Sequence, residues 1–163
     1  GHTIEVSFKN PKNTLTIGDD VYKLQQFHFH APSENEIDGH TYPLEGHFVY
    51  KTDNGKITVV SVLYNYGDEN KALKQIWDKM PQAANTETEL PQPISLDDFY
   101  PEDKDYYNFE GSLTTPPCTE GVNWIVFKNQ ETVSKEQVEK FTQTLGFENN
   151  RPIQDTNGRK IKE

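Results

Sequence analysis

Apolar and polar residues alternate along much of the chain with the period of two that is typical of half-buried β-strands. The alternating runs are rich in valine, isoleucine, tyrosine and phenylalanine, which favour strands. The predicted strands are residues 3–8, 21–30, 44–51, 56–65 and 122–128. Asp53-Asn54-Gly55 is a strong turn signal between the third and fourth of them, so these two are predicted to form a hairpin.

A helix is predicted for residues 69–80, where apolar residues recur at helical spacing. These apolar residues are Leu73, Ile76, Trp77 and Met80. Pro81 is expected to end the helix, because proline lacks the backbone N–H that a helix interior needs. Residues 82–105, which contain three prolines, are predicted to form an irregular loop.

A second helix is predicted for residues 135–145. Ser134 forms a capping box with Gln137, and Gly146 follows as a stop signal. No repeat, low-complexity tract or linker-like stretch divides the sequence. The pattern therefore predicts a mainly β fold (α+β in some schemes). We expect one domain over residues 1–163, a twisted and mostly antiparallel sheet with short peripheral helices.

The composition narrows the classes of function. The chain has 163 residues, enough for one domain with its own core, and a formal net charge of −10. A surface this acidic repels nucleic acids and anionic lipids, so neither is an expected partner. No apolar run approaches the roughly 20 residues of a membrane-spanning helix. Aromatic residues, 12% of the chain, offset a modest aliphatic content because each buries a large area.

Three of the five histidines lie in predicted strands and could share one metal ion. His28 and His30 are two residues apart, so both side chains point to one face of a strand, with Cα atoms about 6.6 Å apart. His47 would complete the set if its strand pairs beside the first. Three neutral imidazoles with an open fourth position are typical of catalytic zinc. Glu45 is the kind of carboxylate expected beside a ligating histidine.

A simpler interpretation competes with the metal site. A His-x-His pair on a strand is more often a surface feature or a coincidence than a pair of ligands. The spacing alone leaves both interpretations open.

Several longer motifs resemble the α-class carbonic anhydrases. They are Gln26-Phe27-His28-Phe29-His30, Ser33-Glu34, Glu45-x-His47, Gly111-Ser112-Leu113-Thr114-Thr115-Pro116-Pro117-Cys118, Val122-Asn123-Trp124-Ile125-Val126 and Asn150-Arg151-Pro152-Ile153-Gln154. The resemblance runs in order along the whole chain, and the short loops are similar to those of bacterial members. It implies the α-carbonic-anhydrase fold and the reversible hydration of carbon dioxide to bicarbonate and a proton by zinc-bound hydroxide, with a side esterase activity.

The resemblance also implies roles for individual residues. His28, His30 and His47 would bind Zn²⁺, with water or hydroxide as the fourth ligand. Thr114 would accept the hydrogen bond of that hydroxide while donating its own proton to an ionised Glu34, which orients the nucleophile. Thr115 would lie at the mouth of the site, where bicarbonate leaves. Without the resemblance, Thr114 is interpreted as a plain turn residue.

Outer partners and a substrate pocket follow from the same resemblance. Gln26 would hold the outer nitrogen of His28, Glu45 that of His47, and the backbone carbonyl near Asn149 that of His30. An apolar pocket would hold carbon dioxide loosely and release it fast. The residues expected there are Val49, Val59, Leu113 and Trp124. Taken alone, these four are equally well interpreted as ordinary core.

His2 aligns with the proton shuttle of the family, a role that suits a histidine because its ordinary pKa is near 6.5. Two positions depart from the commoner family pattern. Asn35 follows Glu34 where many relatives have histidine, and Phe109 stands where many have tyrosine. Together they predict a remodelled hydrogen-bond network behind the metal ligands. His40 is assigned to the surface.

Family members have a sizeable segment before the position of Gly1, so the chain is expected to be N-terminally incomplete. In extracellular members that segment carries a cysteine that would pair with Cys118, the only cysteine in this sequence. The resemblance therefore predicts a periplasmic or secreted bacterial protein that sulfonamides inhibit. A homodimer is predicted as one way to cover the apolar surface that an incomplete chain exposes.

Two other classes stay open at this point. A cupin-type metalloenzyme fits part of His28-x-His30-x-x-x-Glu34, although Tyr22 and Thr41 stand where cupins need glycine. An inactive carbonic-anhydrase-like binding domain is the other class. Such domains usually lack one or more of the ligand histidines, and this chain has all three.

Overall fold

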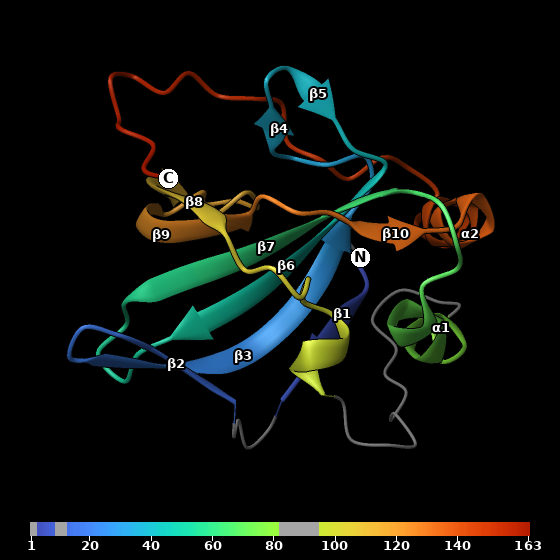
Figure 1. Cartoon of the computed structure of the whole chain (residues 1–163), viewed down its shortest axis with the longest axis horizontal. Helices are drawn as coiled ribbons and strands as arrows, with labels where there is room; N and C mark the ends of the chain where they lie inside the picture. Colours follow the sequence, from blue (N-terminus) through green and yellow to red (C-terminus); the bar gives the residue numbers. More distant parts are fainter. Residues whose placement is uncertain (1–2, 9–12, 82–94) are drawn as a thin grey trace.

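A computed structural model describes residues 3–8, 13–81 and 95–163 of the chain. Within these residues, eight strands form one twisted sheet, whose main path runs β1-β3-β6-β7-β9-β8 (Figure 1). The strands are β1 (Glu5–Ser7), β2 (Thr14–Ile17), β3 (Asp20–His30), β4 (Glu36–Ile37), β5 (His40–Thr41), β6 (Leu44–Lys51), β7 (Ile57–Tyr66), β8 (Tyr106–Ser112), β9 (Glu120–Phe127) and β10 (Glu131–Val133). The helices are α1 (Lys71–Trp77), α2 (Lys135–Leu145) and a 3₁₀ turn at Leu96–Asp98.

Most neighbouring strands in the sheet are antiparallel. β3 pairs with β1, β2 and β6, β6 pairs with β7, and β8 pairs with β9, all in the antiparallel sense. β7 pairs in parallel with both β9 and β10. The two strands β4 and β5 form a separate small hairpin. The predicted mainly β fold, with a mostly antiparallel sheet and peripheral helices, is confirmed.

The sheet is buried on both faces, and the two faces carry different side chains. On one face, phenylalanine and tyrosine side chains from the strands pack against α1, α2 and the 3₁₀ turn. Phe48 in β6 and Trp77 in α1 belong to this aromatic core. On the other face, a smaller cluster contains Val59 and Trp124. Because alternate residues of a strand face opposite sides, β6, β7 and β9 each contribute apolar side chains to both faces.

Part of the way along β3, the alternation of its side chains between the two faces of the sheet is reversed. Its pairing with β6 shifts in register between Leu24 and Gln26. Leu24 and Phe27 both belong to the aromatic core although they are three residues apart, because the extra residue reverses the alternation. His28 and His30, on the opposite parity to Phe27, therefore lie on the other face of the sheet.

The second predicted helix has its predicted bounds, whereas the first is shorter. In α2, Ser134 and Gln137 form the predicted capping box, and Gly146 ends the helix in the left-handed conformation. α1 begins at Lys71, because the Asn70 side chain caps it, and ends at Trp77. The residues after Trp77 turn more tightly, with backbone N–H groups that donate three residues back.

Several strands were missed by the alternation pattern. β4, β5 and β10 have only two or three residues each, which is too few to show a period. β2 and β8 lie at the margins of the sheet and are largely exposed or half-buried, so their polar residues hide the pattern. Residues 82–94 of the predicted loop lie outside the described residues, and the loop's later part contains the 3₁₀ turn.

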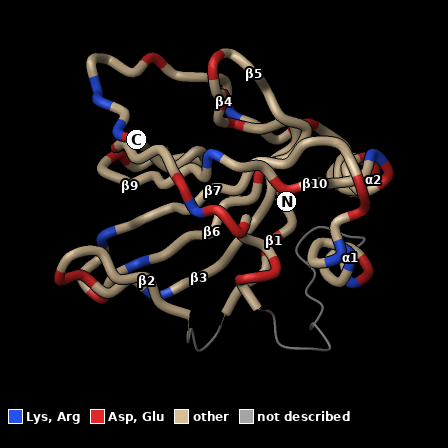
Figure 2. Tube along the Cα trace, viewed as in Figure 1, with Lys and Arg blue, Asp and Glu red and all other residues tan. Residues whose placement is uncertain are grey.

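Charged residues lie mainly in the loops, at strand ends and on the two α-helices (Figure 2). This placement keeps the central parts of the strands free to pack on both faces. In the described part of the chain, no helix combines the length and the apolar character needed to cross a membrane.

Phe27 offers a test of the aromatic core. Its side chain is fully buried, and its ring centroid lies 5.0 Å from that of Phe48 and 5.3 Å from that of Phe99. We expect Phe27→Ala to lower the free energy of unfolding by roughly 3–5 kcal/mol, because it removes buried area and leaves a cavity. Urea denaturation followed by tryptophan fluorescence measures this. The matched control is Ile161→Ala, whose side chain is exposed and whose loss should change stability by less than about 0.5 kcal/mol. Equal effects of the two substitutions would contradict the packing described here.

Candidate metal centre

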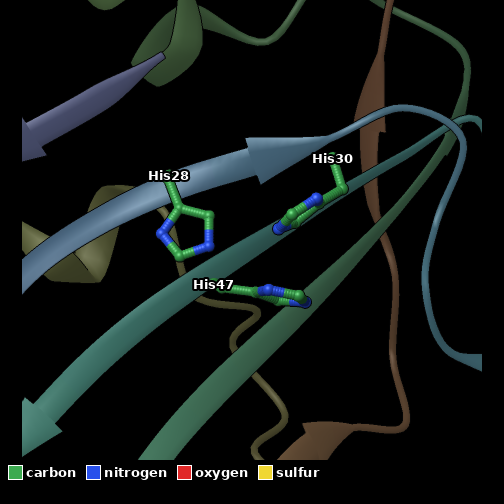
Figure 3. Close-up of side chains that lie close together, drawn as sticks. All are labelled: His28, His30 and His47. Atoms are coloured by element: carbon green, nitrogen blue, oxygen red, sulfur yellow. The ribbon is translucent and has the colours of Figure 1, made fainter. Parts of the chain in front are cut away.

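Strand pairing brings the three predicted metal ligands together. His28 in β3 lies directly opposite His47 in β6, and His30 follows two residues later on the same face of β3. The three rings turn toward a common space (Figure 3). One ligand nitrogen from each ring lies within 4.8 Å of the other two. The arrangement is that of a single metal site built on two neighbouring strands.

Two of the rings are held from behind by the residues predicted for this role. His28 Nδ1 lies 2.8 Å from Gln26 Oε1, and His30 Nδ1 lies 3.0 Å from the backbone oxygen of Asn149. Both acceptors fix a ring N–H at Nδ1, so the Nε2 atoms of His28 and His30 are left for a metal. The Asn149 side chain also accepts from the backbone N–H of Ala31, which ties this segment to the end of β3.

The third ring faces a buried carboxylate. His47 Nε2 lies 2.9 Å from Glu45 Oε2, so its Nδ1 is left for a metal. Burial alone raises the pKa of Glu45, but the charge of His47 and hydrogen bonds from His47, Ser61 and Asn35 outweigh burial and lower that pKa to about 2. Burial alone lowers the pKa of His47, but the charge of Glu45 and their hydrogen bond raise it. The pair therefore holds a negative carboxylate against the ring.

The donor set fits a zinc ion. Burial, together with repulsion from His47, lowers the pKa of His28 well below its usual value and that of His30 to about 3. These two imidazoles are therefore neutral at physiological pH, which is the form that binds metals. His30 Nε2 is buried without a hydrogen-bond partner, as expected for a nitrogen whose lone pair binds a metal. Three histidine nitrogens suit zinc, and the predicted cofactor fits the residues present.

Glu34 lies beside the three histidines and is linked to Thr114. The Thr114 hydroxyl donates to the Glu34 carboxylate, and the backbone N–H of Arg151 donates to Glu34 Oε2 at 2.7 Å. Glu34 Oε1 lies 3.2 Å from His30 Nε2 and 3.7 Å from His47 Nδ1. Burial raises the pKa of Glu34, although the charge of His47 and the two hydrogen bonds oppose it. A divalent cation held by the neighbouring imidazoles would favour the charged carboxylate.

A cavity of about 300 Å³ opens beside these groups. His30, Thr114, Thr115 and Cys118 are among the residues that line it. The backbone N–H of Cys118 donates to the carbonyl of Thr115, which closes a turn in the cavity wall. Thr115 lines the cavity, and its predicted role at the exit of bicarbonate stays a prediction. The Cys118 thiol is free in this chain, so its predicted disulfide stays a prediction.

The four residues predicted for the substrate pocket lie together. Val59 and Trp124 are buried in the smaller cluster, and Val49 and Leu113 pack against it. The ring of Trp124 meets that of His47 edge to face, with centroids 4.9 Å apart. The apolar cluster thus borders a metal ligand directly, and the same side chains also serve as core.

Asn35 and Phe109 are the two positions predicted to remodel the network behind the ligands, and the structure shows the contacts that each makes. Asn35 Nδ2 donates to Glu45 Oε2 at 2.6 Å, whereas Phe109 stacks on Trp124 with nearly parallel rings. The sequence motifs do not single out Ser61, whose hydroxyl also donates to Glu45 Oε2. Ser61 could have been found from the predicted hairpin. The Asp53-Asn54-Gly55 turn sets the register of the two strands, and that register places Ser61 opposite His47.

Two other histidines complete the set of predictions. His2 lies outside the described residues, so its role as proton shuttle stays a prediction. His40 is exposed on β5, in agreement with its assignment to the surface.

Comparison with known proteins gives consistent matches over the whole chain. The sequence model of the family described as eukaryotic-type carbonic anhydrase matches residues 1–163. A carbonic anhydrase from Neisseria gonorrhoeae is 48% identical over 163 residues, which are 100% of this chain and 64% of that protein. A carbonic anhydrase from Pectobacterium carotovorum is 46% identical over 99% of this chain and 66% of its own length.

Solved structures agree with this assignment. The α-carbonic anhydrase from Thermovibrio ammonificans, in complex with sulfanilamide, has a TM-score of 0.95 and 46% identity over 98% of this chain and 70% of its own. This chain spans slightly less than two-thirds of the length of the carbonic anhydrases from Neisseria gonorrhoeae and Pectobacterium carotovorum. Since the family model, the strand order and the three-histidine cluster all agree with the resemblance noted in the sequence, the chain belongs to the eukaryotic-type, or α-class, carbonic anhydrase family.

Proposed function

We propose that this protein catalyses the reversible hydration of carbon dioxide to bicarbonate and a proton. The observation that carries the proposal is the arrangement of His28, His30 and His47, each with its outer nitrogen held and its inner nitrogen turned toward the other two. Such a set leaves one position of a tetrahedral zinc open to solvent. The cavity that His30 lines also contains Thr114, so the open position has a neighbour that can orient a reactant.

The hydrogen bond between Thr114 and Glu34 supports a role in orientation. When bound, zinc lowers the pKa of a coordinated water to about 7, a value established for carbonic anhydrases themselves, and so supplies hydroxide at neutral pH. The Thr114 hydroxyl has only one proton and donates it to Glu34. Its oxygen can therefore only accept from an O–H group in the cavity. This selects one orientation of the reactant, with a lone pair free to attack.

The apolar cluster supports carbon dioxide as the substrate. Carbon dioxide is small and has no net dipole, so it needs an apolar surface rather than hydrogen-bond donors. Val49, Val59, Leu113 and Trp124 provide that surface beside His47. A weak apolar contact also favours fast exchange of substrate and product. We extend the proposal to inhibition by sulfonamides, since sulfanilamide is an inhibitor bound to the Thermovibrio ammonificans relative. The side esterase activity is proposed on the family resemblance alone.

We also propose a periplasmic or secreted location and a homodimer, both of which the family resemblance implies. The cupin interpretation is set aside, because the chain belongs to a different family. A binding role without catalysis is the remaining alternative. It is suggested by dioscorin, a similar protein whose solved structure is a complex with ascorbate. Dioscorin has a TM-score of 0.88 and 34% identity over 99% of this chain and 70% of its own.

Loss of one ligand should abolish both metal retention and activity. We expect His28→Ala to lose its zinc during dialysis and to hydrate carbon dioxide no faster than the buffer does, because two imidazoles hold zinc far more weakly than three. Zinc content and stopped-flow carbon dioxide hydration are the measurements. His40→Ala is the matched control, since His40 is an exposed histidine outside the site, and it should match the unsubstituted chain. A zinc-loaded chain with normal stability but no hydration activity would favour the binding role.

Substitution of Glu34 tests whether its carboxylate orients Thr114 or binds the metal. We expect Glu34→Gln to retain zinc but to hydrate carbon dioxide roughly 10²-fold more slowly, because an amide no longer forces Thr114 to donate its proton. Zinc content and hydration rate should be measured on the same sample. Loss of zinc from this variant would show that Glu34 is a ligand and would contradict the assigned role.

His2 is predicted to carry the product proton to buffer. We expect His2→Ala to slow turnover in weak buffer while leaving the exchange of carbon dioxide and bicarbonate at equilibrium unchanged, because only proton export involves this residue. Stopped-flow assays at low and high buffer concentration, with and without added imidazole, measure the effect. Turnover that is unchanged in weak buffer would assign the shuttle to another group.

A further inference from the structure

The carboxylate behind His47 has an unusually complete set of hydrogen-bond donors. Glu45 is fully buried. Its Oε1 accepts from the backbone N–H groups of Glu34 at 2.7 Å and Asn35 at 2.9 Å. Its Oε2, which lies 2.9 Å from His47 Nε2, accepts from the hydroxyl of Ser61 and from Asn35 Nδ2. Four donors besides the ring therefore hold one carboxylate.

The two oxygens of Glu45 have different kinds of partner. Oε1 is held by the main chain, which no side-chain substitution removes. Oε2 is held by two side chains, and it is also the oxygen that contacts the metal ligand. The position of the His47 contact therefore depends on Ser61 and Asn35.

Ser61 is placed by the sheet itself. It lies directly opposite His47 in the pairing of β6 with β7, and opposite Val126 in the pairing of β7 with β9. Strand neighbours on both sides fix its backbone, and its side chain is fully buried. A short hydroxyl on a fixed strand has little freedom, so it holds Glu45 Oε2 in one place.

We infer that Ser61 and Asn35 are positioning residues that fix the Glu45 oxygen facing His47 and thereby set how tightly the three-histidine site retains its metal. The inference rests on the proposed metal centre and adds two residues to it. Removal of either donor leaves Oε2 with one fewer constraint, so the carboxylate and the His47 ring sample orientations that bind metal less well. The effect reaches the metal through Glu45, so it should be smaller than the effect of removing a direct partner of a ligand.

The experiment compares metal loss from the unsubstituted chain, Ser61→Ala, Asn35→Ala and the double variant. Each protein is loaded with zinc, and the rate of transfer to an excess of a strong chelator is measured. We expect each single variant to lose zinc roughly 3–10-fold faster, below the 10–100-fold typical when a direct outer partner is removed. The double variant should lose zinc more slowly than the product of the two single effects predicts, because both donors act on the same oxygen.

A spectroscopic measurement separates positioning from general destabilisation. The same proteins are loaded with cobalt(II), whose visible absorption bands report the geometry of its ligands. We expect these bands to shift in both single variants and to return toward the original spectrum in Ser61→Thr, which keeps the hydroxyl. Thr58→Ala is the matched control: Thr58 is buried in the same strand, and its hydroxyl oxygen accepts a hydrogen bond from Asn123 Nδ2. It should change neither the spectrum nor the rate of metal loss.

The outcomes separate this inference from the proposed function. Uptake of zinc and cobalt by the unsubstituted chain, with single variants whose rates lie within about two-fold of it and whose spectra superimpose on it, would overturn the inference alone. Failure of the unsubstituted chain to take up either metal would overturn the metal centre and this inference with it. If Ser61→Ala does not fold, Asn35→Ala still decides the question, because Asn35 is only partly buried.

Discussion

One extra residue in β3 decides which side of the sheet receives the metal ligands. Tyr22 and Leu24, before the register shift, face the aromatic core, and Phe27 after it faces the same core. Without the shift, strict alternation would turn the following His28 toward the side that Leu24 occupies. An imidazole among phenylalanine rings would lose its hydrogen bonds to water without replacing them. The bulge thus allows one strand to serve a hydrophobic core and a polar site in succession.

The opposite face gathers three kinds of group that come from different parts of the chain. Two strands supply the imidazoles, the loop after β8 supplies Thr114, and β9 supplies Trp124. The imidazoles and Trp124 lie on strands of one sheet, so strand pairing sets their relative positions. Glu45 links one imidazole to Glu34, because the same carboxylate contacts the His47 ring and accepts from the backbone N–H of Glu34.

Sequence patterns predicted the parts of the structure that depend on local periodicity. The strand at residues 44–51 and the capped helix at 135–145 have the predicted bounds, since alternation and capping act between near neighbours. β2 and β8 escaped prediction because marginal strands have fewer buried positions to mark them. The change of face in β3 is marked in the sequence only by the polar pair Gln25-Gln26, which interrupts the alternation without ending the strand. Ser61 was missed because its contact depends on cross-strand register and on the second oxygen of Glu45.

His30 takes its outer partner from a distant part of the sequence. Asn149 follows it by 119 positions, and the Asn149 amide group also holds the backbone of Ala31 and Phe29. All three imidazoles leave the ribosome long before Asn149 does. A nascent chain that still lacks Asn149 has the complete donor set but lacks the group that fixes the orientation of His30. The orientation of His30 thus requires the fold that brings Asn149 beside the end of β3, so the complete metal site forms together with the tertiary structure and not with the paired strands β3 and β6 alone.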